Sequence, residues 1–101
     1  MITLATEVEI SNAISVSISE DSLSVELDDG RTVTIPISWY PRLFHASEKE
    51  RLNFRLIGNG AGIHWEDLDE DISTAGIIAG HRSQESQSSF KKWLEQRSKA
   101  K

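Results

Sequence analysis

Apolar and polar residues alternate along the first part of the chain. Between Val8 and Ile18 the even positions are apolar except for Asn12, and the odd positions are polar or small. A period of two is typical of a strand with one buried face. Asn12 interrupts the apolar face, which indicates either a bulge or the true start of the strand.

Two further runs alternate in the same way, and residues 28–30 form a turn between them. Residues paired across antiparallel strands lie on the same face of the sheet. A two-residue loop would place Val25 opposite Thr34 and mix the faces, whereas a three-residue loop places Val25 opposite Val33. We therefore predict the three-residue loop, with Gly30 at the position that needs a left-handed backbone.

The same rule sets the pairing of the first two strands across the loop at 19–22. It pairs Ile18 with Leu23, Val16 with Val25, and Ile14 with Leu27. The product is a three-stranded meander with one apolar face and one face rich in serine and threonine. Pro36 has no N–H to donate, so the third strand is predicted to be an edge strand.

An apolar sheet face has to be covered, and the covering elements follow from residue 39 onward. Pro41 marks a helix start, because proline is favoured in the first turn of a helix. Ser47 and Glu50 have the spacing of a capping box, which predicts a short helix over residues 48–53.

Short elements fill the rest of the chain. Residues 54–57 and 63–65 are predicted as strands around a glycine-rich turn. A helix capped by Ser73 is expected to end near Gly80. A final helix follows a serine-rich stretch, and its apolar stripe consists of Phe90, Trp93 and Leu94.

Together these elements predict an α+β fold within a single domain spanning residues 1–101. We expect a three-stranded antiparallel meander plus a short second hairpin, covered by two or three short helices. The sheet-forming half is 1–38, the helical and motif-bearing half is 39–97, and residues 98–101 are a flexible tail.

Composition and charge narrow the possible functions. The chain has no cysteine, which excludes thiolate catalysis and cysteine-ligated zinc and suits a cytoplasmic location. It shows no signal peptide and no apolar run long enough to cross a membrane. The net charge of −5 is arranged in blocks, with acids alone in 1–30 and 61–80 and bases in excess in 31–60 and 81–101. Direct nucleic-acid binding is therefore not expected, because no broad basic face results.

The segment from His64 to Asp71 is the most chemically suggestive, with one histidine and five carboxylates. One interpretation is a metal-dependent enzyme or metal sensor with the candidate ligands His64, Asp67, Asp69 and Asp71. The three aspartates occupy positions 1, 3 and 5 of a calcium loop, but the glycine and glutamate expected later in that loop are missing. The alternative is that these acids cap the next helix, pair with arginines or are solvated.

Residues 39–43 place aromatic side chains beside an arginine. One interpretation is a binding surface, since Trp, Tyr and Arg are frequent in interaction hot spots. The favoured one is a structural corner, in which Arg42 pairs with the acidic segment 66–71. A small-ligand site formed by Trp39 and Trp65 is a further possibility. No nucleophile–base arrangement is evident, so we predict no catalytic residue and no cofactor.

Several motifs resemble those of a widespread bacterial family of small domains of unknown function. They are Asp29-Gly30-Arg31, Trp39–Leu43, Gly58–Trp65, Leu68–Ser73 and Ile77–Gly80. The resemblance implies an α+β fold and gene pairs that look like toxin–antitoxin arrangements. Some relatives carry an added helix-turn-helix domain, for which this chain has too few residues after Gly80.

The leading hypothesis is a non-enzymatic protein-interaction or regulatory domain of antitoxin-like character. Its expected partner is another small protein encoded by a neighbouring gene, or a second copy of the chain. The expected surface combines residues 66–71 with the last helix. The interaction residues predicted from the sequence are Trp39, Arg42, Trp65, Asp69, Glu70, Asp71 and Trp93.

Overall fold

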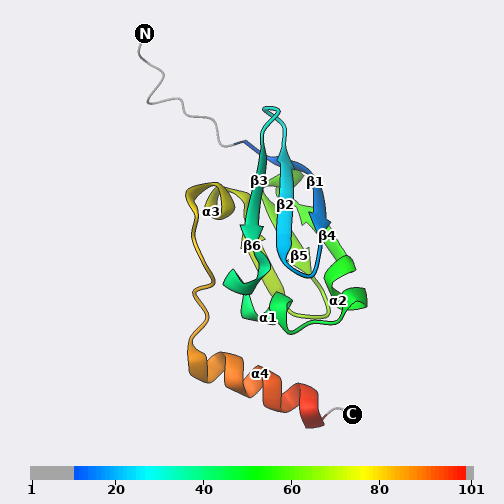
Figure 1. Cartoon of the computed structure of the whole chain (residues 1–101), viewed down its shortest axis with the longest axis vertical. Helices are drawn as coiled ribbons and strands as arrows, with labels where there is room; N and C mark the ends of the chain where they lie inside the picture. Colours follow the sequence, from blue (N-terminus) through cyan, green and yellow to red (C-terminus); the bar gives the residue numbers. More distant parts are fainter. Residues whose placement is uncertain (1–10, 100–101) are drawn as a thin grey trace.

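The first sheet is the predicted antiparallel meander. In the computed structural model, which describes residues 11–99, it consists of β1 (Ala13–Ile18), β2 (Ser22–Leu27) and β3 (Thr32–Pro36). The strands lie in the order β1-β2-β3 (Figure 1). Pro36 therefore ends an edge strand, as predicted from its missing N–H.

The predicted register of β2 and β3 is confirmed. Val25 lies opposite Val33, and the Leu27 N–H donates to the carbonyl of Arg31 at 2.8 Å. Gly30 has a φ of 94°, which a side chain with a Cβ rarely adopts. The three-residue turn therefore keeps the apolar residues of both strands on one face.

The start of β1 differs from the prediction. Val16 and Ile18 pair with β2 as expected, but Ala13 instead of Ile14 lies opposite Leu27. A bulge lies between Ala13 and Ser15, so Ile14 is 55% exposed. The prediction that Ile14 faces the core is wrong. The strand begins directly after Asn12, and the predicted strand residues 8–10 lie outside the described part of the chain.

The backbone of β1 packs closely against a turn of the second sheet at the bulge. Ala13 is buried beneath the turn that contains Gly60. A Cβ at Gly60 would clash with the carbonyl oxygen of Ala13. Ala13 therefore takes the inner position at this close approach, and the bulge places Ile14 outside.

The second sheet contains one strand more than predicted. Its strands are β4 (Phe54–Ile57), β5 (Gly62–Trp65) and β6 (Glu70–Ser73), in the order β4-β5-β6. The first two form the predicted hairpin, joined by the short 3-10 helix η3 (Gly58–Gly60). Strand β6 was missed because its four residues include only one apolar side chain, Ile72, and follow an acidic turn.

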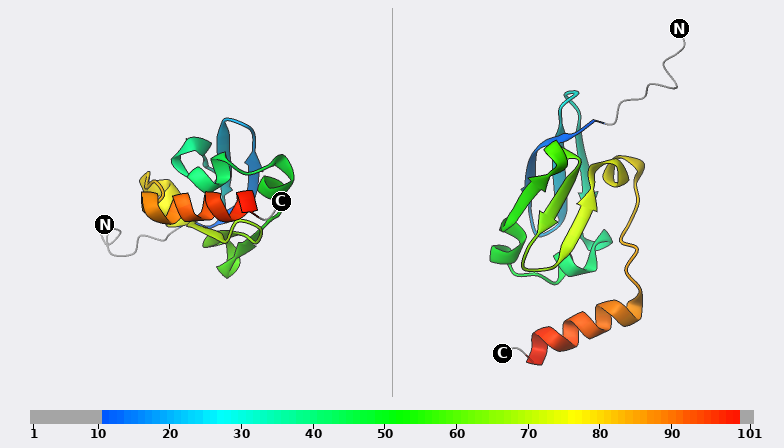
Figure 2. Two further views of the ribbon diagram at one scale, coloured as in Figure 1. Left: turned by 90° about the horizontal axis from the view of Figure 1, so that it is seen from below. Right: turned by 180° about the vertical axis from the view of Figure 1, so that it is seen from behind.

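The two sheets lie face to face (Figures 1 and 2). One continuous core contains residues of both sheets, including Leu23, Val25 and Leu27 of β2 and Ile63, Trp65 and Ile72 of the second sheet. The cover of the meander is therefore mainly another sheet, whereas we expected helices. The predicted α+β class is confirmed, and the short helices lie mostly at the ends of the two layers.

Helices follow the capping signals in the sequence. Their bounds are η2 (Ile37–Trp39), α1 (Pro41–Phe44), α2 (Glu48–Leu52), α3 (Thr74–Ala79) and α4 (Gln87–Lys99). Ser47 and Glu50 form the predicted capping box of α2. Ser73 caps α3, which ends at Gly80 with a φ of 80°.

The C-terminal helix α4 lies below α1 and α2, beyond the end of the two sheets (Figure 1). It includes Ser98 and Lys99, which we expected to belong to a flexible tail. Residues 100–101 lie outside the described part. None of the helices within residues 11–99 has the length and apolar character needed to cross a membrane.

The bulge can be tested by comparing two apolar residues of the first sheet. Leu27→Ala should lower the free energy of unfolding by about 3 kcal/mol, because Leu27 is fully buried. Ile14→Ser should change it by less than about 0.5 kcal/mol, because Ile14 faces water. Urea denaturation measures both values. If Ile14→Ser lowered the free energy of unfolding nearly as much as Leu27→Ala, the register expected from the sequence would be correct and the bulge would be refuted.

Candidate functional site

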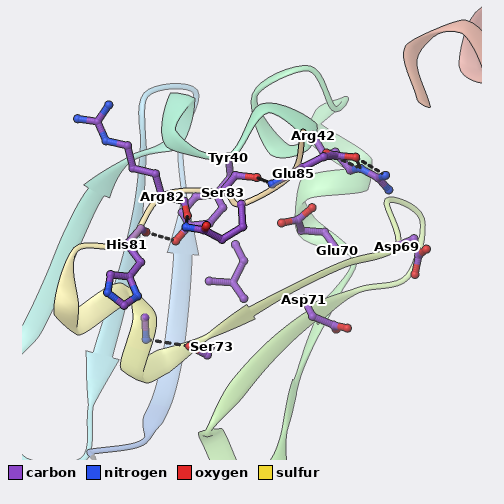
Figure 3. Close-up of a pocket in the computed structure, with 13 residues that line it drawn as sticks. Tyr40, Arg42, Asp69, Glu70, Asp71, Ser73, His81, Arg82, Ser83 and Glu85 are labelled. Atoms are coloured by element: carbon purple, nitrogen blue, oxygen red, sulfur yellow. Dashed lines mark hydrogen bonds and ion pairs between the residues drawn. The ribbon is translucent and has the colours of Figure 1, made fainter. Parts of the chain in front are cut away.

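A cleft of about 670 Å³ lies between β6 and the extended segment that joins α3 to α4 (Figure 3). We call this segment, residues 81–86, the linker. One wall of the cleft consists of residues 69–73, and the other consists mainly of residues 81–85. Tyr40 and Arg42 also line the cleft.

Hydrogen bonds from the corner after β3 hold the linker in place. The Tyr40 hydroxyl donates to the carbonyl of His81 at 2.7 Å. The Ser83 N–H donates to the carbonyl of Trp39 at 3.1 Å. No backbone hydrogen bond joins the linker to β6 among residues 11–99, so the two walls remain separate.

Arg42 joins three parts of the molecule at one end of the cleft. Its Nε and Nη2 donate to the Glu85 carboxylate at 3.0 and 2.6 Å, and its Nη1 donates to the carbonyl of Leu68 at 2.7 Å. The side chain of Arg42 is only 16% exposed, and that of Glu85 only 13%. Such a bidentate pair fixes the relative orientation of the two side chains and also neutralises their charges.

Arg42 does contact the segment 66–71 as predicted, through the carbonyl of Leu68, but its charged partner is Glu85 and not an acid of that segment. Leu68 is fully buried, which turns the backbone of the acidic turn toward Arg42. The turn contributes a carbonyl oxygen, and the carboxylate comes from Glu85 in the linker. The interpretation of residues 39–43 as a structural corner holds, since Tyr40 and Leu43 are buried.

Aromatic and ionic contacts attach α4 to the rest of the chain. The Arg42 guanidinium lies 5.2 Å from the centre of the Trp93 ring, and the Arg97 guanidinium lies 4.5 Å from it. Arg97 also donates to both carboxylate oxygens of Glu50 in α2, at 2.8 and 2.9 Å. Trp93 is consequently buried, and its cation–π contacts link α4 to α1.

Glu70 is the unusual acid of the cleft. It pairs with Trp65 across the sheet, so its side chain lies on the core-facing side and is half-buried. Its carboxylate has no hydrogen-bond partner among residues 11–99. Burial raises the pKa of Glu70 to about 7, and nearby Glu85, Asp71 and Asp69 add to this effect while Arg42 opposes it.

The candidate metal ligands do not converge. His64 Nδ1 and Asp71 Oδ1 are 2.5 Å apart on the outer face of the second sheet, and this contact raises the pKa of His64. Asp67 instead accepts a hydrogen bond from Asn53 at 2.9 Å, and Asp69 lies in the turn with a φ of 51°. Within residues 11–99, no three histidine or acidic side chains are placed to share an ion.

The tryptophans do not form the aromatic surface that the sequence suggested. Trp65 is 0% exposed and donates its indole N–H to the carbonyl of Arg51. Trp39 is half-buried, with the Arg82 guanidinium 4.7 Å from its ring centre. A direct contact between Trp65 and a partner or ligand is therefore excluded in this fold, and Trp93 is largely covered too.

Four of the predicted interaction residues do come together, since Arg42, Asp69, Glu70 and Asp71 all line the cleft. Sequence reasoning did not identify the linker as a wall or Tyr40 as its anchor. Glu85 was also missed, although it is the single carboxylate of residues 81–94 and thus the available linker partner for a buried arginine.

Two stacked three-stranded sheets with a cleft beside one edge define a small α+β domain. Residues 13–83 match the family described as protein of unknown function (DUF2442). The match covers most of the chain, and the chain belongs to this family. The family resemblance seen in the sequence is confirmed to that extent, while the toxin–antitoxin gene arrangement stays a prediction.

Solved structures of similar fold come from two bacteria. A protein of unknown function from Rhodospirillum rubrum is 28% identical, with a TM-score of 0.66, over 79% of this chain and 96% of that one. An uncharacterized protein from Chromobacterium violaceum is 21% identical, with a TM-score of 0.62, over 72% of this chain and 69% of that one. A search of curated proteins gave no match.

Removal of the Arg42 guanidinium should loosen α4. Arg42→Gln leaves Glu85 without its partner, so we expect a loss of about 2 kcal/mol in the free energy of unfolding and faster hydrogen exchange in α4. Arg55→Gln is the matched control, because the pair of Arg55 with Glu66 is exposed and 3.8 Å long. Equal exchange rates in both variants would contradict the role given to Arg42.

Glu70 should make stability depend on pH in a defined direction. Its pKa is raised from 4.5 to about 7 on folding, so the protein loses stability as the pH rises through this range. Glu70→Gln should therefore be about 1–2 kcal/mol more stable than the natural chain at pH 8 and equal to it at pH 4. Urea unfolding at both values provides the measurement, and a difference independent of pH would refute this assignment.

Proposed function

We propose that this chain is a non-enzymatic protein-interaction domain that acts as the regulatory, antitoxin-like member of a two-protein pair. The observation that carries the proposal is the junction at Arg42. It contacts the acidic turn, the linker and α4, so one arginine at the end of the cleft connects the two parts of the predicted surface, while α4 itself lies outside the cleft. The linker residues 84–86 and α4 lie outside the span matched by the family, 13–83.

The side chains of the cleft favour binding over catalysis. Arg42 and Tyr40 are engaged in contacts that hold the fold together. Glu70 titrates near neutral pH, yet no nucleophilic side chain is hydrogen-bonded to it among the described residues. Nucleophilic catalysis needs such a pair within hydrogen-bond reach.

The metal-dependent alternative has weaker support. His64 and Asp71 could supply two ligands on the outer face, but His64 is already held between Asp71 and Glu66. Asp67 and Asp69 are directed elsewhere. A metal enzyme normally has at least three protein ligands around one ion, and the candidate ligands do not supply them.

Co-expression with the product of the neighbouring gene tests the proposed function. The tagged chain should retain that protein on an affinity column and should relieve any toxicity that it causes alone. Arg42→Gln should weaken both effects, because it disrupts the junction, whereas Ile14→Ser on the far sheet should not. Failure of the natural chain both to co-purify its neighbour and to rescue growth would refute the proposal.

A further inference from the structure

We propose that the cleft receives an extended segment of a partner protein, which adds as a strand to β6 and places a lysine or arginine beside Glu70. This inference rests on the proposed interaction function and specifies the chemistry of the partner. The partner segment would be recognised by the free edge of β6 and by the unpartnered carboxylate of Glu70, both of which line the cleft (Figure 3).

Strand β6 offers an open edge. It pairs with β5 on one side, and among residues 11–99 no backbone hydrogen bond joins residues 70–73 to any segment on the other side. A row of free N–H and C=O groups is a template for another strand. Addition of a peptide to such an edge is a common mode of recognition, in which the main chain provides affinity and side-chain sites provide specificity.

The position of this edge distinguishes it from the other edges in the two sheets. β6 is the only strand in the described chain that contributes residues to the lining of the cleft. The linker forms the opposite wall and is anchored there by the Tyr40 and Ser83 hydrogen bonds. The cleft volume lies within the range of protein binding sites and has room for several peptide residues.

Charge selects the side chain that this peptide carries. The lining contains four carboxylates against two guanidinium groups. Arg42 donates to Glu85 and to the carbonyl of Leu68 and makes no hydrogen bond to Glu70, and Arg82 lies against the ring of Trp39. Glu70 is left with no donor among the described residues, although it is half-buried. A cationic side chain would supply the missing hydrogen bonds and the compensating charge.

The surroundings of Glu70 also set the pH dependence of binding. It faces Arg42 and Tyr40 from the corner after β3, and Glu85 from the linker, while Asp69 and Asp71 flank it in the chain. An ionised Glu70 binds a cation better than a neutral one. Affinity for a basic peptide should therefore increase between pH 6 and pH 8, where lysine and arginine remain charged.

Selection from a phage-displayed library of random twelve-residue peptides tests the proposal even while the natural partner is unidentified. The intact chain should enrich extended sequences with a shared lysine or arginine. Calorimetry with a synthetic copy should show affinity about tenfold weaker for Glu70→Gln. Glu66→Gln, an acid on the same turn outside the cleft, is the matched control and should bind as the natural chain does.

A second readout tests strand addition itself. N-methylation of alternate backbone nitrogens is made in two versions of the selected peptide, one for each alternate set. The version methylated on the nitrogens that face β6 should lose binding, because methylated nitrogens cannot join a sheet ladder, and the other version should bind. No enriched peptide, a peptide without a basic residue, equal binding to Glu70→Gln, or tolerance of both methylated versions would each overturn the proposal. Continued co-purification of the neighbouring protein in such a case would leave the interaction function standing and refute this site alone.

Discussion

Mutual burial of two apolar sheet faces is the interaction on which the rest of the molecule depends. Neither three-stranded sheet has enough helix above it to cover its own apolar side, so each serves as the cover of the other. Trp65 has the largest fully buried side chain among residues 11–99 and belongs to this shared core. Because β6 belongs to the same sheet, its alternation forces Glu70 toward the interior, and the unusual acid of the cleft is a direct result of the layered core.

The second organising feature is polar. Helix α4 has a modest apolar stripe, and its attachment relies on Trp93 held between two arginines and on the pair of Arg97 with Glu50. Ionic and cation–π contacts of this kind are individually weak and depend on geometry. Arg42 belongs to both arrangements, because it contacts Trp93 of α4 and pairs with Glu85 in the linker.

The sequence was informative where local rules determine structure. Period-two alternation and the turn at Gly30 identified the meander, and Ser47, Ser73 and Gly80 marked helix ends. It was less informative where distant segments meet. The bulge that exposes Ile14 lies where β1 packs against Gly60, nearly fifty residues away, and the partner of Arg42 depends on how the linker returns along β6. The sequence alone predicted four residues that line the cleft, Arg42, Asp69, Glu70 and Asp71, as interaction residues. It could not show that Trp65 is buried in the core.

The bulge in β1 has a consequence for how copies of this protein behave at high concentration. An irregular edge cannot form a continuous ladder with a regular strand, and Pro36 removes a donor from the edge of β3. Both edge strands of the first sheet, β1 and β3, are thereby protected against edge-to-edge aggregation with other copies of the chain. The first sheet is therefore a poor template for aggregation, and the edge proposed to receive a partner strand, β6, belongs to the second sheet.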